Sequence, residues 1–110
     1  MNDKSLEENR EKGSSSQNET IKLTGEIAGE RIQQLETELL EKVNNLSENT
    51  AMSLDLKEVQ RIDSKGVALI VGLFKECTLK KISLTVITSS DTYRILSQIK
   101  LDRVINIKKE

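Results

Sequence analysis

The centre of the chain reads Arg61-Ile62-Asp63-Ser64-Lys65-Gly66-Val67-Ala68-Leu69-Ile70-Val71-Gly72-Leu73-Phe74-Lys75. Just before it, Leu54-Asp55-Leu56 alternates apolar and polar side chains, a pattern that indicates a strand. After it, apolar side chains recur at the three- and four-residue spacing of a helix that ends near Thr78, at Val67, Ile70, Val71, Phe74 and Cys77. Asp63 and Ser64 are residue types that cap helix N-termini. We therefore expect a strand, a tight turn and a helix whose positive end presents the Ser64 hydroxyl.

Length and charge restrict the classes of function. A chain of 110 residues forms one small domain, and its 17 basic and 18 acidic side chains leave a net charge of -1. The lysine pairs Lys80-Lys81 and Lys108-Lys109 are too short for a nucleic-acid patch and are typical of solvated ends. No apolar run approaches the roughly 20 residues of a membrane span, and residues 1–17 lack the apolar centre of a signal peptide. We expect neither nucleic acid nor a membrane as a partner.

Several residue types needed for catalysis are missing. The chain has no histidine, which is the commonest general base and metal ligand, and the single Cys77 excludes a multi-cysteine metal site. There is no glycine-rich phosphate loop, and Phe74 and Tyr93 are the only aromatic residues. We therefore expect no enzyme activity, no metal and no cofactor. A lone cysteine on a core face fits the reducing cytoplasm.

The order of elements predicts the fold class. Residues 1–18 are charged and small, which predicts a flexible tail, and the folded domain is expected over residues 19–110. The domain pattern predicts strands at 20–24, 52–56, 82–87 and 104–107, alternating with helices over 30–46, from Ser64 to about Thr78, and over about 90–99. This alternation indicates a small α/β sandwich, with a parallel or mixed sheet of four to five strands and three to four helices. Functional loops in such sheets follow the carboxyl ends of strands, where the Gly25-Glu26-Ile27 exit and the Asp63-Ser64 turn both lie.

Three roles are open to Ser64 on the residues alone. It, or Asp63, caps the helix, as most such residues do. A nucleophilic serine would need a base, and neither a histidine nor a group that orients Lys65 is present. As a phosphorylation site, Ser64 would gain a charge of about -1.5 to -2 at a helix N-terminus that tolerates anions. The fold would then survive while the surface offered to a partner changed.

A family resemblance favours the third role. The core of STAS domains, in particular of the bacterial anti-sigma factor antagonists, resembles two runs of this chain, Leu54-Asp55-Leu56-Lys57-Glu58-Val59 and Ile62-Asp63-Ser64-Lys65-Gly66-Val67-Ala68-Leu69-Ile70-Val71-Gly72. Leu23-Thr24-Gly25-Glu26-Ile27 looks like the strand exit of that family, and Leu101-Asp102-Arg103-Val104-Ile105-Asn106-Ile107 is similar to its closing segment. The resemblance covers roughly residues 19 to 107. The Asp-Ser-x-Gly turn is fairly specific within this frame and weak outside it.

The resemblance implies a partner switch. In that family the unmodified antagonist binds an anti-sigma factor that is also a serine kinase, and a sigma factor is thereby released for transcription. The kinase phosphorylates the serine after the aspartate, here Ser64, and a metal-dependent serine phosphatase reverses the reaction. The resemblance also implies that Asp63 contacts the kinase and that the strand exit at Gly25, Glu26 and Ile27 takes part. The exposed face of the following helix is the expected docking surface, formed by Lys65, Gly66, Leu69 and Gly72.

Two other hypotheses remain at this point. One is a scaffold STAS module that binds a transporter subunit or a sensory assembly without being phosphorylated. The other is a hydrolase that uses Ser64, for which the chain offers no general base. The docking face itself has an alternative, because Leu69 and Gly72 would be covered if the helix were buried on two sides.

Overall fold

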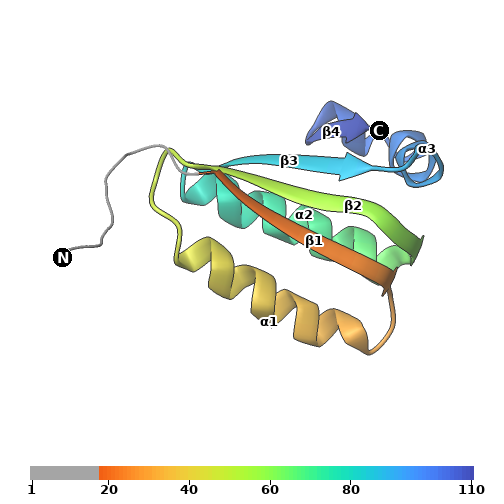
Figure 1. Ribbon diagram of the computed structural model, residues 1–110, viewed down its shortest axis with the longest axis horizontal. Helices are drawn as coiled ribbons and strands as arrows, with labels where there is room; N and C mark the ends of the chain where they lie inside the picture. Colours follow the sequence, from red (N-terminus) through yellow and green to blue (C-terminus); the bar gives the residue numbers. More distant parts are fainter. Residues whose placement is uncertain (1–17) are drawn as a thin grey trace.

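The fold is built on a sheet of four parallel strands whose order in space follows their order in the chain (Figure 1). The computed structural model describes residues 18–110. The strands are β1 (Asn18–Ile27), β2 (Ala51–Ile62), β3 (Ser83–Thr88) and β4 (Asn106–Lys109), and the helices are α1 (Arg31–Asn44), α2 (Ser64–Leu79) and α3 (Ser90–Gln98), with a 3-10 turn at Leu101–Arg103. The predicted α/β class is confirmed. The tail expected over residues 1–18 lies outside the described residues, except for Asn18, which begins β1.

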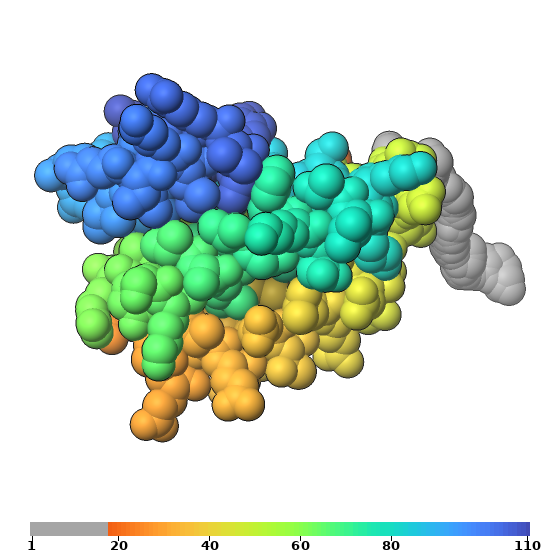
Figure 2. Space-filling view, turned by 180° about the vertical axis from the view of Figure 1, so that it is seen from behind, coloured from red at the N-terminus to blue at the C-terminus, as the bar shows by residue number. Residues whose placement is uncertain are grey.

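The two longer helices form a layer on one face of the sheet. Because neighbouring strands are consecutive and parallel, right-handed crossovers place the connecting helices on the same side. Figure 1 shows α1 and α2 side by side against that face, with α3 at the far end of β3. From behind, α2 lies between α1 and the C-terminal segments (Figure 2). The helix that follows the Asp63-Ser64 turn therefore lies between two other parts of the chain, whereas its last residue, Leu79, is exposed.

Alternating strand residues and one face of each helix form the core. The sheet contributes Ile21, Leu23, Met52, Leu54, Leu56, Leu84 and Val86, and the helices contribute Leu35, Leu39, Val43, Ile70, Leu73 and Cys77. Each large apolar side chain that is fully buried contributes about 1.5–3 kcal/mol to folding. Burial raises the pKa of the Cys77 thiol to about 11, so this residue is a protonated core side chain.

All four strands have boundaries that differ from the predicted ones, and the end of β2 and the start of β4 have a clear structural reason. β2 continues through the polar run after Leu56 as far as Ile62, because it pairs with β1 along its whole length, and two register shifts match its 12 residues to the 10 of β1. β4 begins two residues later than predicted, at Asn106, because Leu101–Arg103 forms a 3-10 turn that buries Leu101 and Ile105. Tertiary pairing and burial decide these boundaries where local propensity is weak.

Lys80 is part of the helix layer and is not one of the solvated ends predicted from the sequence. Its ammonium donates hydrogen bonds to the carbonyl oxygens of Val43 at 3.0 Å, Asn44 at 2.9 Å and Leu46 at 3.2 Å. These carbonyls belong to the C-terminal end of α1, where the helix leaves acceptors unpaired and where the macrodipole favours a cation. Lys80 follows α2, so it joins the ends of the two helices.

We expect Lys80→Met to lower the free energy of unfolding by about 1–2 kcal/mol, because three charge-assisted hydrogen bonds are lost while most of the apolar stem is kept. Urea denaturation followed by circular dichroism measures the change. Lys81→Met is the matched control, since Lys81 is exposed and its side chain makes no hydrogen bond within residues 18–110. Equal loss in the two variants would contradict this role for Lys80.

Candidate functional site

The Asp63-Ser64 turn and the end of β1 meet at the carboxyl edge of the sheet. β1 and β2 end side by side, and the Asp63 N–H donates a hydrogen bond to the Ile27 carbonyl at 3.4 Å. α2 then begins at Ser64, whose side chain is exposed. The prediction that both loops lie at the carboxyl edge of the sheet is therefore confirmed. Ser64 is the first residue of α2 at that edge.

The Asp63 carboxylate joins these two loops. One oxygen, Oδ1, accepts a hydrogen bond from the Gly66 N–H at 2.9 Å and caps α2, and Oδ2 accepts one from the Gly29 N–H at 3.2 Å. The hydrogen bond from Gly66 lowers the pKa of the Asp63 carboxyl below its ordinary value, with smaller effects in the same direction from Gly29 and Arg61. Asp63 is therefore an anion that organises the turn. A direct contact with a kinase stays a prediction.

The exit of β1 has a bulge that an arginine clamps. Gly25 has a φ of +79°, a conformation that favours glycine, and the register with β2 shifts directly after it. Nη1 of Arg31 donates to the carbonyls of Thr24 and Glu26, both at 2.7 Å. The exposed carboxylate of Glu26 also pairs with Arg61 at 3.3 Å. Of the three strand-exit residues predicted to take part in partner binding, Glu26 offers an exposed side chain.

Ile27 and Gly66 are in the interior of this site. Ile27 is fully buried, and a Cβ added at Gly66 would lie 2.2 Å from the Ile27 carbonyl oxygen and 2.7 Å from Cγ1 of Ile62. Real Cβ atoms do not approach that closely, so the start of α2 can rest on β1 only with glycine at position 66. The expectation that Gly66 belongs to an exposed face is therefore wrong, because the packing of α2 on the strand exit covers it.

Leu69 is also not on an exposed face. Its side chain is 7% exposed, because α2 packs on the sheet with one side and on α1 with the other. Val67, Val71 and Phe74, which the helical spacing predicted as core, are only half-buried. Lys65 and Gly72 are exposed as predicted. A role for Leu69 in partner binding stays a prediction. The Leu69 side chain lies at the floor of a groove.

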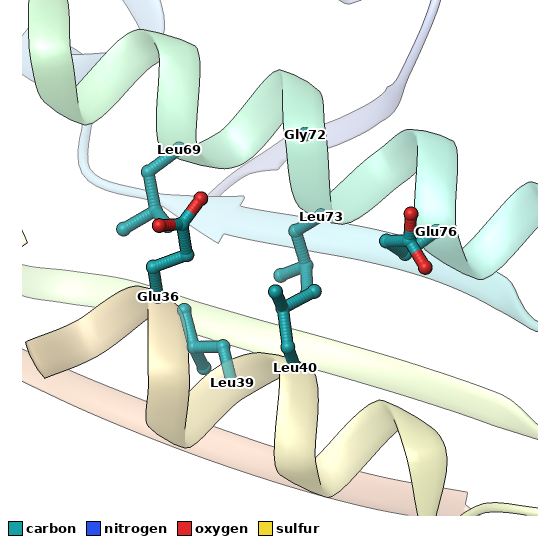
Figure 3. Close-up of a pocket in the computed structure, with 7 residues that line it drawn as sticks. All are labelled: Glu36, Leu39, Leu40, Leu69, Gly72, Leu73 and Glu76. Carbon is teal, nitrogen blue, oxygen red and sulfur yellow. The ribbon is translucent and has the colours of Figure 1, made fainter. Parts of the chain in front are cut away.

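That groove runs between α1 and α2, and sequence reasoning missed the α1 side of it. Figure 3 shows Leu40 of α1 and Leu73 of α2 pointing toward each other across it, with Glu36 beside Leu69. Near Ser64, a second hollow is lined by Gly29, Glu30, Ile32, Gln33, Glu36 and Lys65. The amphipathic pattern of α1 predicted which face packs on the sheet. Glu36 and Leu40 lie at the edge of that face, and they line a groove only because α2 packs beside α1.

Ser64 is open to solvent at the first residue of α2. No acidic residue follows it in the first turn of α2, and within residues 18–110 no cluster of histidine, cysteine or carboxylate side chains could hold a metal ion. The described helices also include none that is long and apolar enough to cross a bilayer. An anion attached to Ser64 would extend into solvent at the positive end of α2.

We expect Asp63→Asn to destabilise the domain most at neutral pH. The pKa of the Asp63 carboxyl is lower in the folded protein than its value of 3.8 in the unfolded chain. The ionised carboxylate therefore stabilises the fold fully at a pH above 3.8, and this stabilisation is lost as the pH falls through the lower, folded pKa. The difference in urea midpoint between wild type and Asp63→Asn should therefore narrow below about pH 4. A difference that stays constant from pH 7 to pH 3 would contradict the anionic role.

Gly66→Ala should lower the free energy of unfolding by about 2 kcal/mol or more, because the added methyl group meets the Ile27 carbonyl. Gly72→Ala is the matched control on the same helix. It should raise stability by about 0.5–1 kcal/mol, since an added Cβ there meets nothing within 4 Å. Urea denaturation of both variants measures the contrast, and a loss at both positions would contradict it.

Comparison with known families agrees with this geometry. No curated protein matches the chain. The family model that describes the STAS domain matches residues 14–110, which is most of the chain, and the four parallel strands and three helices fit that fold. The protein therefore belongs to the STAS domain family.

Proposed function

We propose that this protein is an anti-sigma factor antagonist that works by partner switching in the cytoplasm. Its unphosphorylated form binds an anti-sigma factor that is also a serine kinase, and a sigma factor is thereby freed. Phosphorylation of Ser64 by that kinase releases the antagonist, and a metal-dependent serine phosphatase restores it. On this proposal the protein has no enzyme activity of its own and acts through the surface it offers.

The observation that carries the proposal is the exposed hydroxyl of Ser64 on the first residue of α2. A kinase needs access to the serine oxygen, and the turn projects it at the carboxyl edge of the sheet. Asp63 keeps its own charge in hydrogen bonds to Gly66 and Gly29, so the turn stays rigid while Ser64 is modified. Membership of the STAS family supports the same assignment.

The physical basis of the switch is a change of charge without a change of fold. A phosphate would place about -1.5 to -2 charge on an exposed side chain at the positive end of α2, so the helix would tolerate it. A partner shaped to a neutral serine would have to desolvate that charge or leave the interface. Lys65, which is also exposed, is the nearest cation along the chain and would compensate only part of it.

Incubation with the kinase, ATP and Mg²⁺ should add one phosphate to the wild type and none to Ser64→Ala, as measured by intact-mass spectrometry. By calorimetry, Ser64→Ala should keep the affinity of the unmodified protein for the kinase. Ser64→Asp should lower that affinity roughly tenfold or more, because a charge enters the interface.

Equal affinity of wild type and Ser64→Asp would refute the switch. Binding without phosphorylation would instead favour the scaffold alternative, in which the STAS module joins a transporter subunit or a sensory complex and Ser64 is only part of the helix start. Covalent labelling of Ser64 by an active-site serine probe would overturn the non-enzymatic assignment.

A further inference from the structure

We propose that the groove between α1 and α2 receives an amphipathic helix from the partner protein, which places one apolar side chain in the groove and a lysine or arginine between Glu36 and Glu76. This inference rests on the proposed function, because the groove begins at Lys65, next to Ser64. It adds the chemistry of the partner segment, which the assignment of Ser64 alone does not specify.

The hollow in the groove has the size and lining for one aliphatic side chain. Its volume is about 140 Å³, and it is lined by Glu36, Leu39, Leu40, Leu69, Gly72, Leu73 and Glu76 (Figure 3). An apolar cavity of about 150 Å³ holds a molecule as large as benzene. Leu39, Leu69 and Leu73 are already buried in the domain and form the floor, whereas Leu40 is half-buried and remains available at the wall.

The charges around the hollow select a cation. Glu36 comes from α1 and Glu76 from α2, and within residues 18–110 neither carboxylate forms an ion pair. Glu36 is exposed and Glu76 is half-buried. Two carboxylates at the edges of an apolar floor complement a lysine or arginine whose stem covers the leucines while its charged end reaches the rim.

Gly72 supplies an independent reason to expect a close approach at this point. Glycine in the middle of a helix is less favourable than alanine, and an added Cβ at Gly72 would meet nothing within 4 Å. The fold therefore does not require glycine here, in contrast to Gly66. A bare backbone in the wall of the groove allows a partner helix to approach α2 closely.

A second hollow lies between the groove and the edge that carries Ser64. The hollow near Lys65 and the hollow that ends at Glu76 share Glu36 as a lining residue. Positions 65 to 76 of a helix span about 16 Å, which accommodates roughly three turns of a partner helix. A helix in this groove would therefore reach from the apolar hollow to the modification site, so a phosphate on Ser64 would lie at the end of the same interface.

The test uses a synthetic amidated peptide of about four helical turns, with leucines on one face and lysines beside them. The matched control peptide carries glutamine in place of every lysine. Both are titrated into the full-length ¹⁵N-labelled protein, and the amide resonances are followed by NMR. The lysine peptide should shift the resonances of Leu40, Leu69, Gly72 and Leu73, and should bind at least fivefold more tightly than the glutamine peptide.

Variants of the protein test whether the peptide binds in the groove or elsewhere on the surface. Glu36→Gln combined with Glu76→Gln should remove the preference for the lysine peptide. The control pair Glu41→Gln and Glu48→Gln makes the same change in net charge at exposed positions outside the groove and should keep the preference. Gly72→Leu should fill the hollow and abolish peptide binding, and its unfolding midpoint, at or above that of wild type, will show that the variant is folded.

Other occupants would overturn the proposal. Shifts of the groove resonances on raising the protein concentration alone would identify a second copy, and shifts caused by Leu6→Ala would identify residues 1–17 of the same chain. Equal affinity for the two peptides, or no shifts in the groove, would also overturn it. The peptide titration contains no kinase, so its failure would not contradict phosphorylation of Ser64. Conversely, an absence of phosphorylation by the kinase would not contradict peptide binding in the groove.

Discussion

The carboxylate of Asp63 is the interaction on which the functional edge of the domain depends. It accepts hydrogen bonds from the first turn of α2 and from the loop that leads into α1, so a single side chain sets the relative position of two crossovers. The hydrogen bond from Gly66 lowers its pKa, which keeps it ionised at the pH of a cell. Ser64 therefore follows directly after the residue that links the two loops.

Two glycines on α2 illustrate different physical demands. Gly66 is required by packing, because any larger residue would collide with the carbonyl of Ile27. Gly72 is not required by the fold at all, since the space beside it is empty. Gly66 allows α2 to pack closely on the sheet. Gly72 leaves the backbone of α2 accessible beside α1, where the proposed partner helix would bind.

The charged side chains of the helix layer have distinct tasks. Lys80 donates hydrogen bonds to three carbonyl groups at the C-terminal end of α1. Arg31 donates hydrogen bonds to two carbonyl groups at the bulge near the end of β1. The carboxylates of Glu36 and Glu76 have no such partner in the described part of the chain. An almost neutral protein therefore has a locally acidic groove between α1 and α2.

Alternation in the strands, the three- and four-residue spacing in the helices and the Asp63-Ser64 cap determined the α/β class, the order of elements and the exposed Ser64. These features are local, so a linear sequence carries them. The burial of Gly66 and Leu69, the extension of β2 through its polar run and the engagement of Lys80 were decided only by tertiary structure. Each depends on a residue more than 20 positions away, such as Ile27 against Gly66 or Val43 against Lys80. A helical pattern predicts one buried face, but a second buried face arises only when another helix packs beside the first.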